Sequence, residues 1–291
     1  MTHGYGLIAV KIGLHLSIAG AIDKAVDRAL LLGCDTFQIF TRNPRQWRAR
    51  ELTVDETRAF VEKVTTNDLT PVFSHMPYLP NLASPRDEVH AKSVAALTLE
   101  LERGSRLSIP YLVTHLGSHL GAGVPAGTSR IVDAIDRALG VADGRVMLLL
   151  ENSAGTRHSM GGSFAGIADL IRRLADPERV GVCLDTCHAF AAGYDLRTRV
   201  AVKETLQKID TTVGFEKLKL VHLNDSRGEL GSHMDRHAHI GLGKIGEKGF
   251  RHLLRSRLGQ LPLILETPQD ESRRDIDNLR KVRELAGDPF G

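Results

Sequence analysis

The chain has 291 residues, and its 42% of hydrophobic residues suffice for one large domain with a full core. A net charge of +3 excludes binding of nucleic acid through an overall positive field, so any such contact must come from local patches. Three cysteines, an odd number, indicate a reducing cytoplasm rather than a disulfide framework. We expect no signal peptide and no membrane span, because no apolar run reaches ~20 residues.

Eight short apolar runs bounded by polar residues are typical of strands buried on both faces of a parallel sheet. In chain order they are KIGLH ending at His15, TFQIF at Phe40, PVFSH at His75, YLVTH at His115, VMLLLE at Glu151, VGVCLD at Asp185, LKLVH at His222 and LPLILE at Glu266. Seven of the eight therefore end on a histidine or a carboxylate.

The segments between these runs have Ala, Leu, Arg and Glu at helical spacing. These predicted helices are residues 19–33, 53–68, 85–107, 127–142, 163–176, 198–212, 248–258 and 270–286. Alternating strands and helices predict a single-domain (β/α)8 TIM barrel over residues 11–291, with residues 1–10 as an extension that can be disordered. An open doubly wound sheet is the alternative, but its ligands gather at one switch point, whereas polar strand ends here are spread along the whole chain.

The strand ends predict a metal centre. Burying one ionisable group costs free energy unless a partner compensates it, and the carboxyl ends of barrel strands converge at one mouth. Bound cations would compensate several such groups together.

The motif Cys183-Leu184-Asp185-Thr186-Cys187-His188 adds one ligand. The spacing lets Asp185 and His188, which we place in the following loop, turn into one pocket. We interpret Cys183 and Cys187 as core residues, because a zinc site built from both would need a second Cys or His pair at matching spacing.

The long glycine-rich stretch 222–246 is predicted to be a functional loop. Asp235 and His237 lie two residues apart, so in extended backbone they share a face. His239 has the same parity and is a weaker candidate, and its role stays open.

These features give nine candidate metal ligands: His75, His115, Glu151, Asp185, His188, His222, Asp235, His237 and Glu266. Nine ligands are too many for one ion and suit two or three, with carboxylates bridging. Imidazole and carboxylate without thiolate favour zinc, with manganese or iron as alternatives.

Two segments beside these ligands indicate a nucleic-acid backbone as substrate. Residues 42–50 carry four arginines, the amide of Gln46 and Trp47, which we expect to pack on the barrel. Beyond His75, the residues Tyr78 and Leu79 form a stiff apolar wedge of the kind that enters a base stack.

The chain resembles the endonuclease IV family of apurinic/apyrimidinic (AP) endonucleases over nearly its whole length. The motifs that carry the resemblance are GLHLS at 13–17, NPRQW at 43–47, ENSAG at 151–155, GVCLDTCH at 181–188, HLNDS at 222–226, DRH at 235–237 with IGLG at 240–243, and LET at 265–267.

This resemblance implies a three-zinc site held by the nine residues. It implies hydrolysis of double-stranded DNA 5′ to an abasic site, which leaves a 3′-hydroxyl and a 5′-deoxyribose phosphate, and trimming of blocked 3′ ends. Glu151 would be the catalytic bridging carboxylate, and His115 would bind one of the two bridged ions. A third ion, near Asp235, His237 and His188, would stabilise the leaving oxygen. Arg45 and Tyr78 match the positions where the family inserts side chains at the lesion.

Three other functions compete with this one. The narrowest is DNA cleavage without specificity, which a groove that recognises the shape of the backbone rather than the bases would permit. A sugar or sugar-phosphate isomerase on a similar metal-binding barrel would need a proton shuttle at the mouth and fewer histidine ligands. A DNA-damage binding protein without activity would have lost ligands, and none is lost. We expect a monomer without membrane contact.

Overall fold

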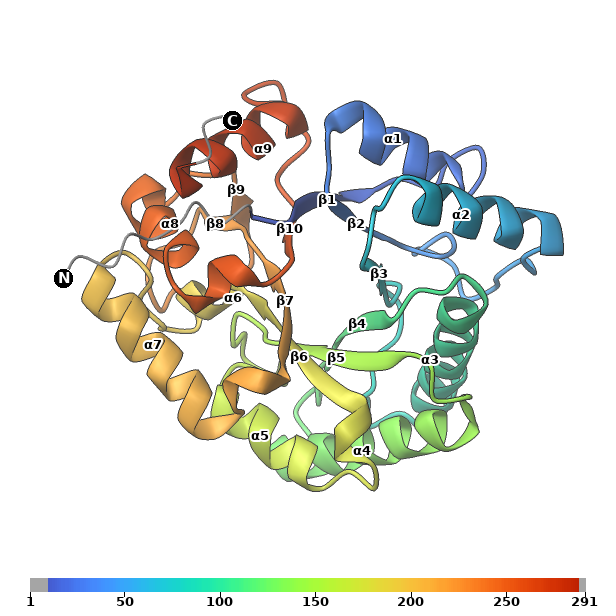
Figure 1. Cartoon of the computed structure of the whole chain (residues 1–291). Coiled ribbons are helices and arrows are strands. Elements are labelled where there is room, and N and C mark those ends of the chain that lie inside the picture. Colours follow the sequence, from blue (N-terminus) through green and yellow to red (C-terminus); the bar gives the residue numbers. More distant parts are fainter. Residues whose placement is uncertain (1–9, 288–291) are drawn as a thin grey trace.

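The computed structural model describes residues 10–287, where eight parallel strands form a closed barrel (Figure 1). The barrel strands are β1 (Ile12–Leu16), β2 (Thr36–Ile39), β3 (Val72–His75), β4 (Tyr111–His115), β5 (Met147–Glu151), β6 (Val180–Asp185), β7 (Leu218–His222) and β10 (Leu263–Leu265). Each strand pairs with its neighbour along the chain except that β7 pairs with β10, which also pairs with β1 and so closes the barrel.

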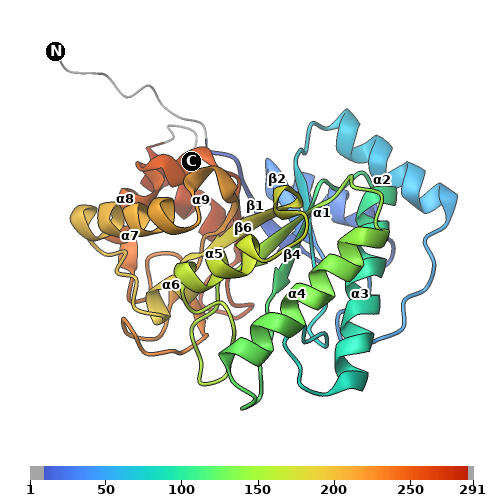
Figure 2. The ribbon, with the colours of Figure 1, turned by 90° about the horizontal axis from the view of Figure 1, so that it is seen from below.

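Helices surround the barrel, as the view turned by 90° also shows (Figure 2). They are α1 (Lys24–Leu32), α2 (Val54–Thr66), α3 (Asp87–Arg106), α4 (Val124–Val141), α5 (Phe164–Arg172), α6 (Thr186–Ala191), α7 (Arg199–Thr212), α8 (Gly246–Leu254) and α9 (Asp275–Ala286). The predicted TIM barrel is therefore confirmed. Within residues 10–287 no helix is long and apolar enough to cross a membrane.

The barrel interior explains where the polar strand ends point. Its apolar filling is one layer of buried side chains, composed of Phe73, Val113, Leu149, Cys183, Leu220 and Ile264. Side chains alternate between the two faces of a strand, so the residue two positions later points to the same side. That residue is in turn His75, His115, Glu151, Asp185, His222 and Glu266. The candidate ligands therefore form the next layer up, at the mouth of the barrel.

Several predicted boundaries are wrong at helix ends. The last helix begins at Asp275 rather than at residue 270, because Asp270 accepts the backbone N–H of Ser272 in a preceding turn. The helix predicted to continue to residue 176 ends at Arg172 and is followed by a short 3-10 helix, Pro177–Arg179. Of the predicted extension at residues 1–10, only Val10 lies within the described residues, and it is buried.

His188 is not in a loop as predicted but in the short helix α6. This helix begins directly after β6 because the carboxylate of Asp185 accepts the backbone N–H of His188 at 2.7 Å and so caps the first turn. One residue thus ends a strand, caps a helix and presents its second oxygen to the mouth.

Substitution of Gly13 tests the close approach of β1 and β2. A Cβ at Gly13 would lie 1.7 Å from the carbonyl oxygen of Thr36, so Gly13→Ala must push the strands apart. We expect a loss of roughly 1–3 kcal/mol or more in the free energy of unfolding, measured by urea denaturation. Gly140→Ala in α4 meets nothing within 4 Å and should instead gain about 0.5–1 kcal/mol from helix propensity. Equal stability of Gly13→Ala and the unsubstituted protein would contradict this.

Candidate metal centre

The mouth of the barrel brings together eight of the nine predicted ligands in three overlapping groups, in each of which the potential ligand atoms lie within 4.8 Å of one another. The groups are His75, His115 and Glu151; Glu151, Asp185, His222 and Glu266; and Asp185, His188 and His237. The ninth, Asp235, contacts the third group through its Oδ1, 3.0 Å from Nε2 of His188. Glu151 and Asp185 each belong to two groups and so link all three.

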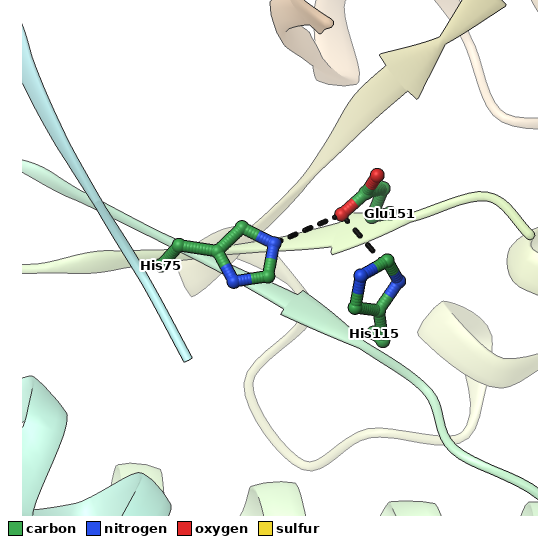
Figure 3. A group of neighbouring side chains, drawn as sticks. All are labelled: His75, His115 and Glu151. Carbon is green, nitrogen blue, oxygen red and sulfur yellow. Dashed lines mark hydrogen bonds and ion pairs between the residues drawn. The ribbon is translucent and has the colours of Figure 1, made fainter. Parts of the chain in front are cut away.

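The first group lies across the ends of β3, β4 and β5 (Figure 3). The Oε2 atom of Glu151 is 3.1 Å from Nε2 of His75 and 3.5 Å from Nδ1 of His115. His75 and Glu151 are buried, whereas the His115 side chain is 47% exposed. This group therefore has one side open for a substrate.

The central group is formed around His222. Its Nδ1 lies 3.2 Å from Oε1 of Glu151 and 3.3 Å from Oε2 of Glu266. The opposite ring nitrogen, Nε2, is 2.9 Å from Oε1 of Gln38, a fully buried amide in β2. Because the amide oxygen can only accept, Nε2 carries a proton, and Nδ1 faces the two carboxylates, where either a second proton or a cation can bind to it.

The third group combines α6 with the long loop after β7. The Nε2 atom of His237 is 3.6 Å from Oδ2 of Asp185, and Nδ1 of His188 is 3.7 Å from Oδ1 of the same carboxylate. His237 lies in a two-stranded hairpin in which β8 (Asp225–Ser226) pairs with β9 (His237–Ala238). The hairpin returns the chain to the mouth, which places two ligands that the barrel strands themselves do not supply.

Asp225 holds this long loop in place. Its buried carboxylate accepts backbone N–H groups from Gly241, Gly243 and Ile245 at 2.9–3.0 Å. A Cβ at Gly243 would lie 2.5 Å from Oδ1 of Asp225, so this glycine is needed for the close approach. The glycines of the predicted functional loop thus wrap around one carboxylate.

The orientation of the histidines fits bound cations. His75 and His237 each donate an Nδ1–H to a backbone carbonyl oxygen, of Met76 and Glu266, at 2.7 and 2.8 Å. Their Nε2 lone pairs consequently face the carboxylates, and Nε2 of His237 is buried without any hydrogen-bond partner. Lone pairs that face carboxylate oxygens repel them unless a proton or a cation lies between. The residues present therefore fit a metal centre.

The pKa shifts express the same electrostatics. Burial would raise the pKa of Glu151 and of Glu266, but nearby histidines outweigh it and hold both well below the usual range. Burial would lower the pKa of His188, but Asp185, Asp235 and Glu151 outweigh it and raise this pKa well above its usual value. Without metal, protons supply the positive charge that the carboxylates require.

Gln38, Asn152, Asn224 and His15 support the ligands and were not among the nine predicted. Asn224 donates to Oδ2 of Asp185 at 2.7 Å, and the carbonyl oxygen of Asn152 lies 3.0 Å from Nδ1 of His188. His15 contacts Oε1 of Glu266 at 3.0 Å. Three sequence signals were available: His15 ends an apolar run, Gln38 is the only amide inside one, and Asn152 directly follows a candidate ligand.

His239 and the cysteines lie outside the three groups. His239 is buried, with Nε2 3.0 Å from Oδ1 of Asp270 and Nδ1 3.0 Å from Nδ2 of Asn278, so it joins the segment after β9 to the segment that leads into α9. Cys183 and Cys187 are buried as predicted, and burial raises the pKa of each thiol to about 12, so both stay protonated.

The predicted DNA contacts Arg45, Gln46, Tyr78 and Leu79 are exposed on the loops after β2 and β3, beside the first group. Tyr78 packs its ring edge against Phe40 at 5.0 Å, and Phe40 in turn lies 5.6 Å from the ring of His75. The aromatic side chains thus lead from the mouth to the surface.

One part of the predicted arginine patch is wrong. Arg42 is 5% exposed and forms an ion pair with the buried Glu100, with Nε 2.6 Å from Oε1, so it is not available to a substrate. Arg50 is exposed but pairs with Glu56. Trp47, expected to pack on the barrel, is 37% exposed.

Comparison with known proteins identifies relatives that match nearly the whole chain. A family model described as a xylose isomerase-like TIM barrel matches residues 26–285. A probable endonuclease 4 from Methanoculleus marisnigri is 56% identical over 280 residues, which cover 96% of this chain and 99% of the relative.

Solved structures give the same family and a wider fold group. Endonuclease IV from Thermus thermophilus is similar, with a TM-score of 0.83, 38% identity and coverage of 95% of this chain and 98% of that one. A D-tagatose 3-epimerase-like protein has a TM-score of 0.71 at 17% identity, over 97% of this chain and 100% of that one, and at this identity the likeness shows the fold alone. By its sequence relatives and its barrel, this chain belongs to the endonuclease 4 family.

Proposed function

We propose that the protein is a zinc-dependent DNA-repair nuclease that hydrolyses the phosphodiester bond 5′ to an abasic site. The products are a 3′-hydroxyl end and a 5′-deoxyribose phosphate end, and the same site trims blocked 3′ ends. The observation that carries this proposal is the set of nine linked ligands at the mouth, directly beside exposed arginine and tyrosine side chains. The relatives' printed names, endonuclease 4 and endonuclease IV, support a nuclease.

Three zinc ions suit the ligands. Five imidazoles and four carboxylates, with protonated thiols kept apart, favour zinc over softer metals, with manganese or iron as alternatives in one site. All nine ligands come from one chain, which supports a monomer as the active form. When bound, the ions supply Lewis-acid stabilisation of charge on the phosphate and the leaving oxygen, and they lower the pKa of water.

The side chains of the protein bind and orient the DNA. Arg45 and Gln46 contact the backbone and the gap at the lesion, while Tyr78 and Leu79 enter the base stack beside it. A nucleotide without a base has lost its stacking, so turning it out of the duplex costs less free energy than turning out an intact nucleotide. That difference makes the mouth selective for damage. Glu151, whose pKa nearby histidines hold well below its usual range, stays ionised there, and Glu151 and Asp185 together link the three groups of ligands.

Cleavage of a defined substrate tests this function together with Glu151→Gln. The protein should cut a duplex with one abasic analogue once, 5′ to the lesion, with close to three zinc per chain by mass spectrometry. Because Glu151 belongs to two groups, Glu151→Gln should lower the cleavage rate by about 10²-fold or more and lower the zinc content, with the barrel retained by circular dichroism.

Glu62→Gln, which changes an exposed carboxylate of α2, serves as the matched control and should behave as the unsubstituted protein. Uncut abasic DNA with all metals bound would overturn the proposed function. A Glu151→Gln rate equal to the unsubstituted rate would overturn the role of Glu151.

The wedge is tested by Tyr78→Ala. Loss of base–aromatic stacking should weaken binding to the abasic duplex about ten-fold, with zinc content unchanged and a smaller effect on intact duplex, measured by fluorescence anisotropy. Val141→Ala truncates a side chain of comparable exposure at the C-terminal end of α4 and should have no effect. Identical affinities of Tyr78→Ala and Val141→Ala would rule out the wedge.

The metal-free protein should lose stability as the pH rises. For His188 and His222 burial alone would lower the pKa, but neighbouring groups raise it well above 6.5 in the folded protein. The stability they contribute is present below the unfolded pKa of about 6.5 and is lost as the pH rises through the folded pKa. Burial lowers the pKa of His15 and His115, so their effect is confined to lower pH.

We therefore expect the Tm of chelator-treated protein to fall as the pH rises above about 6.5. The zinc-loaded protein should not show this fall, because metal binding requires deprotonated imidazole and replaces the proton. Differential scanning calorimetry of both forms over this range gives the comparison. A Tm that rises with pH in the metal-free form would contradict the assignment of charge at the mouth.

A further inference from the structure

The segment of residues 41–50, hereafter the arginine loop, carries Arg45 and Gln46 to the mouth without any helix or strand of its own. It borders a cavity of about 400 Å³ whose lining includes Gly20 and Ala21 of the loop after β1, Arg48 and Arg50 of the arginine loop, and Arg103 of α3. Side chains therefore do not pack closely against the whole loop, and its hydrogen bonds show what else holds it.

Helix α3 contacts the arginine loop through Glu100, which is fully buried. Its Oε2 accepts a hydrogen bond from Oγ1 of Thr41 at 2.7 Å, and its Oε1 accepts one from Nε of Arg42 at 2.6 Å. Both oxygens of one carboxylate thus bind the beginning of the loop.

Arg103, one turn later on α3, holds both ends of the loop. Its Nε donates to Oγ1 of Thr41 at 2.7 Å, its Nη2 donates to the carbonyl oxygen of Thr41, and its Nη1 donates to the carbonyl oxygen of Arg50 at 2.9 Å. Arg42 in turn donates from Nη1 to the carbonyl oxygen of Gln46 at 2.6 Å. The beginning, middle and end of the loop backbone are all bound.

Charge distinguishes this network from ordinary packing. Glu100 is 0%, Arg42 5% and Arg103 4% exposed, so two guanidinium groups and one carboxylate have left water. Such a group of buried charges is a weak source of net stability, because desolvation offsets most of the attraction. Its directional hydrogen bonds, aimed at loop carbonyl oxygens, select one backbone conformation.

The arginine loop is hydrogen-bonded to the wedge residue Tyr78. The backbone N–H of Tyr78 donates to the carbonyl oxygen of Pro44 at 3.1 Å, next to Arg45. A displaced arginine loop would therefore displace Tyr78 as well. Neither Glu100 nor Arg103 belongs to the three metal groups.

We infer that Glu100 and Arg103 of α3 are positioning residues that hold Arg45, and through Pro44 also Tyr78, ready to contact the lesion. This inference rests on the proposed function. It assigns to a helix on the outside of the barrel a role in affinity and in lesion preference, separate from the chemistry at the metal centre.

The test uses Thr41→Val, which removes one hydroxyl from the network, and Glu100→Gln. Loss of preorganisation should raise KM for abasic duplex on the order of ten-fold and reduce the preference over intact duplex, while kcat and zinc content stay near those of the unsubstituted protein. Thr41→Ser keeps the hydroxyl and should restore KM.

Limited trypsin digestion measures how well ordered the arginine loop is, without any measurement of activity. The bonds after Arg45, Arg48 and Arg50 lie in the loop, so Thr41→Val should be cut there several-fold faster, with Thr41→Ser unchanged. Glu102→Gln, an exposed change on the same helix, is the matched control.

Unchanged trypsin cleavage and unchanged KM in Thr41→Val would overturn the inference, as would a loss of kcat and zinc at constant KM. If the unsubstituted protein failed to cut abasic DNA, the proposed function would fail. Faster loop cleavage in Thr41→Val would then still support the role of the network in ordering the loop.

Discussion

The crowding of four carboxylates at the mouth of one barrel is the constraint on which the structure depends. Alternation along β5 and β6 places Glu151 and Asp185 directly above an apolar interior layer, where water cannot screen them. The fold tolerates these buried negative charges because positive charge compensates them, either as protons on His188 and His222 or as bound cations. The same feature that makes the mouth costly to bury makes it a binding site for metal.

Hydrogen bonds behind the ligands decide which atoms face the centre. Gln38 accepts the N–H of one nitrogen of His222, and backbone carbonyl oxygens do the same for His75 and His237. Each ring is thereby held with its other nitrogen toward the carboxylates. Asp225 orders a whole segment rather than one ring. Its carboxylate accepts backbone N–H groups of the long loop, and this holds the hairpin with His237 at the mouth.

The surface beside the centre is held in place by different interactions from those that hold the candidate ligands. Most candidate metal ligands come from strand ends, where closure of the barrel fixes them, whereas Arg45 and Tyr78 lie on loops that border solvent. Loops of this kind are placed by hydrogen bonds to rigid elements, and here the bonds come from Glu100 and Arg103 on α3. The candidate metal centre is therefore held by the barrel strands, whereas the loop residues beside it are held by hydrogen bonds to α3.

The sequence by itself determined the barrel, the strand ends and the nine candidate ligands, because spacing along a strand dictates which residues share a face. Its resemblance to a known family also pointed to Arg45 and Tyr78 as contacts to a substrate. The helical turn at His188 depends on a local cap, in which the carboxylate of Asp185 accepts the backbone N–H of His188. Only the tertiary structure decided that Arg42 is buried against Glu100, that His239 pairs with Asp270, and that Gln38 contacts His222. These contacts join residues far apart in the chain, and local spacing holds no information about distances that barrel closure and loop anchoring set.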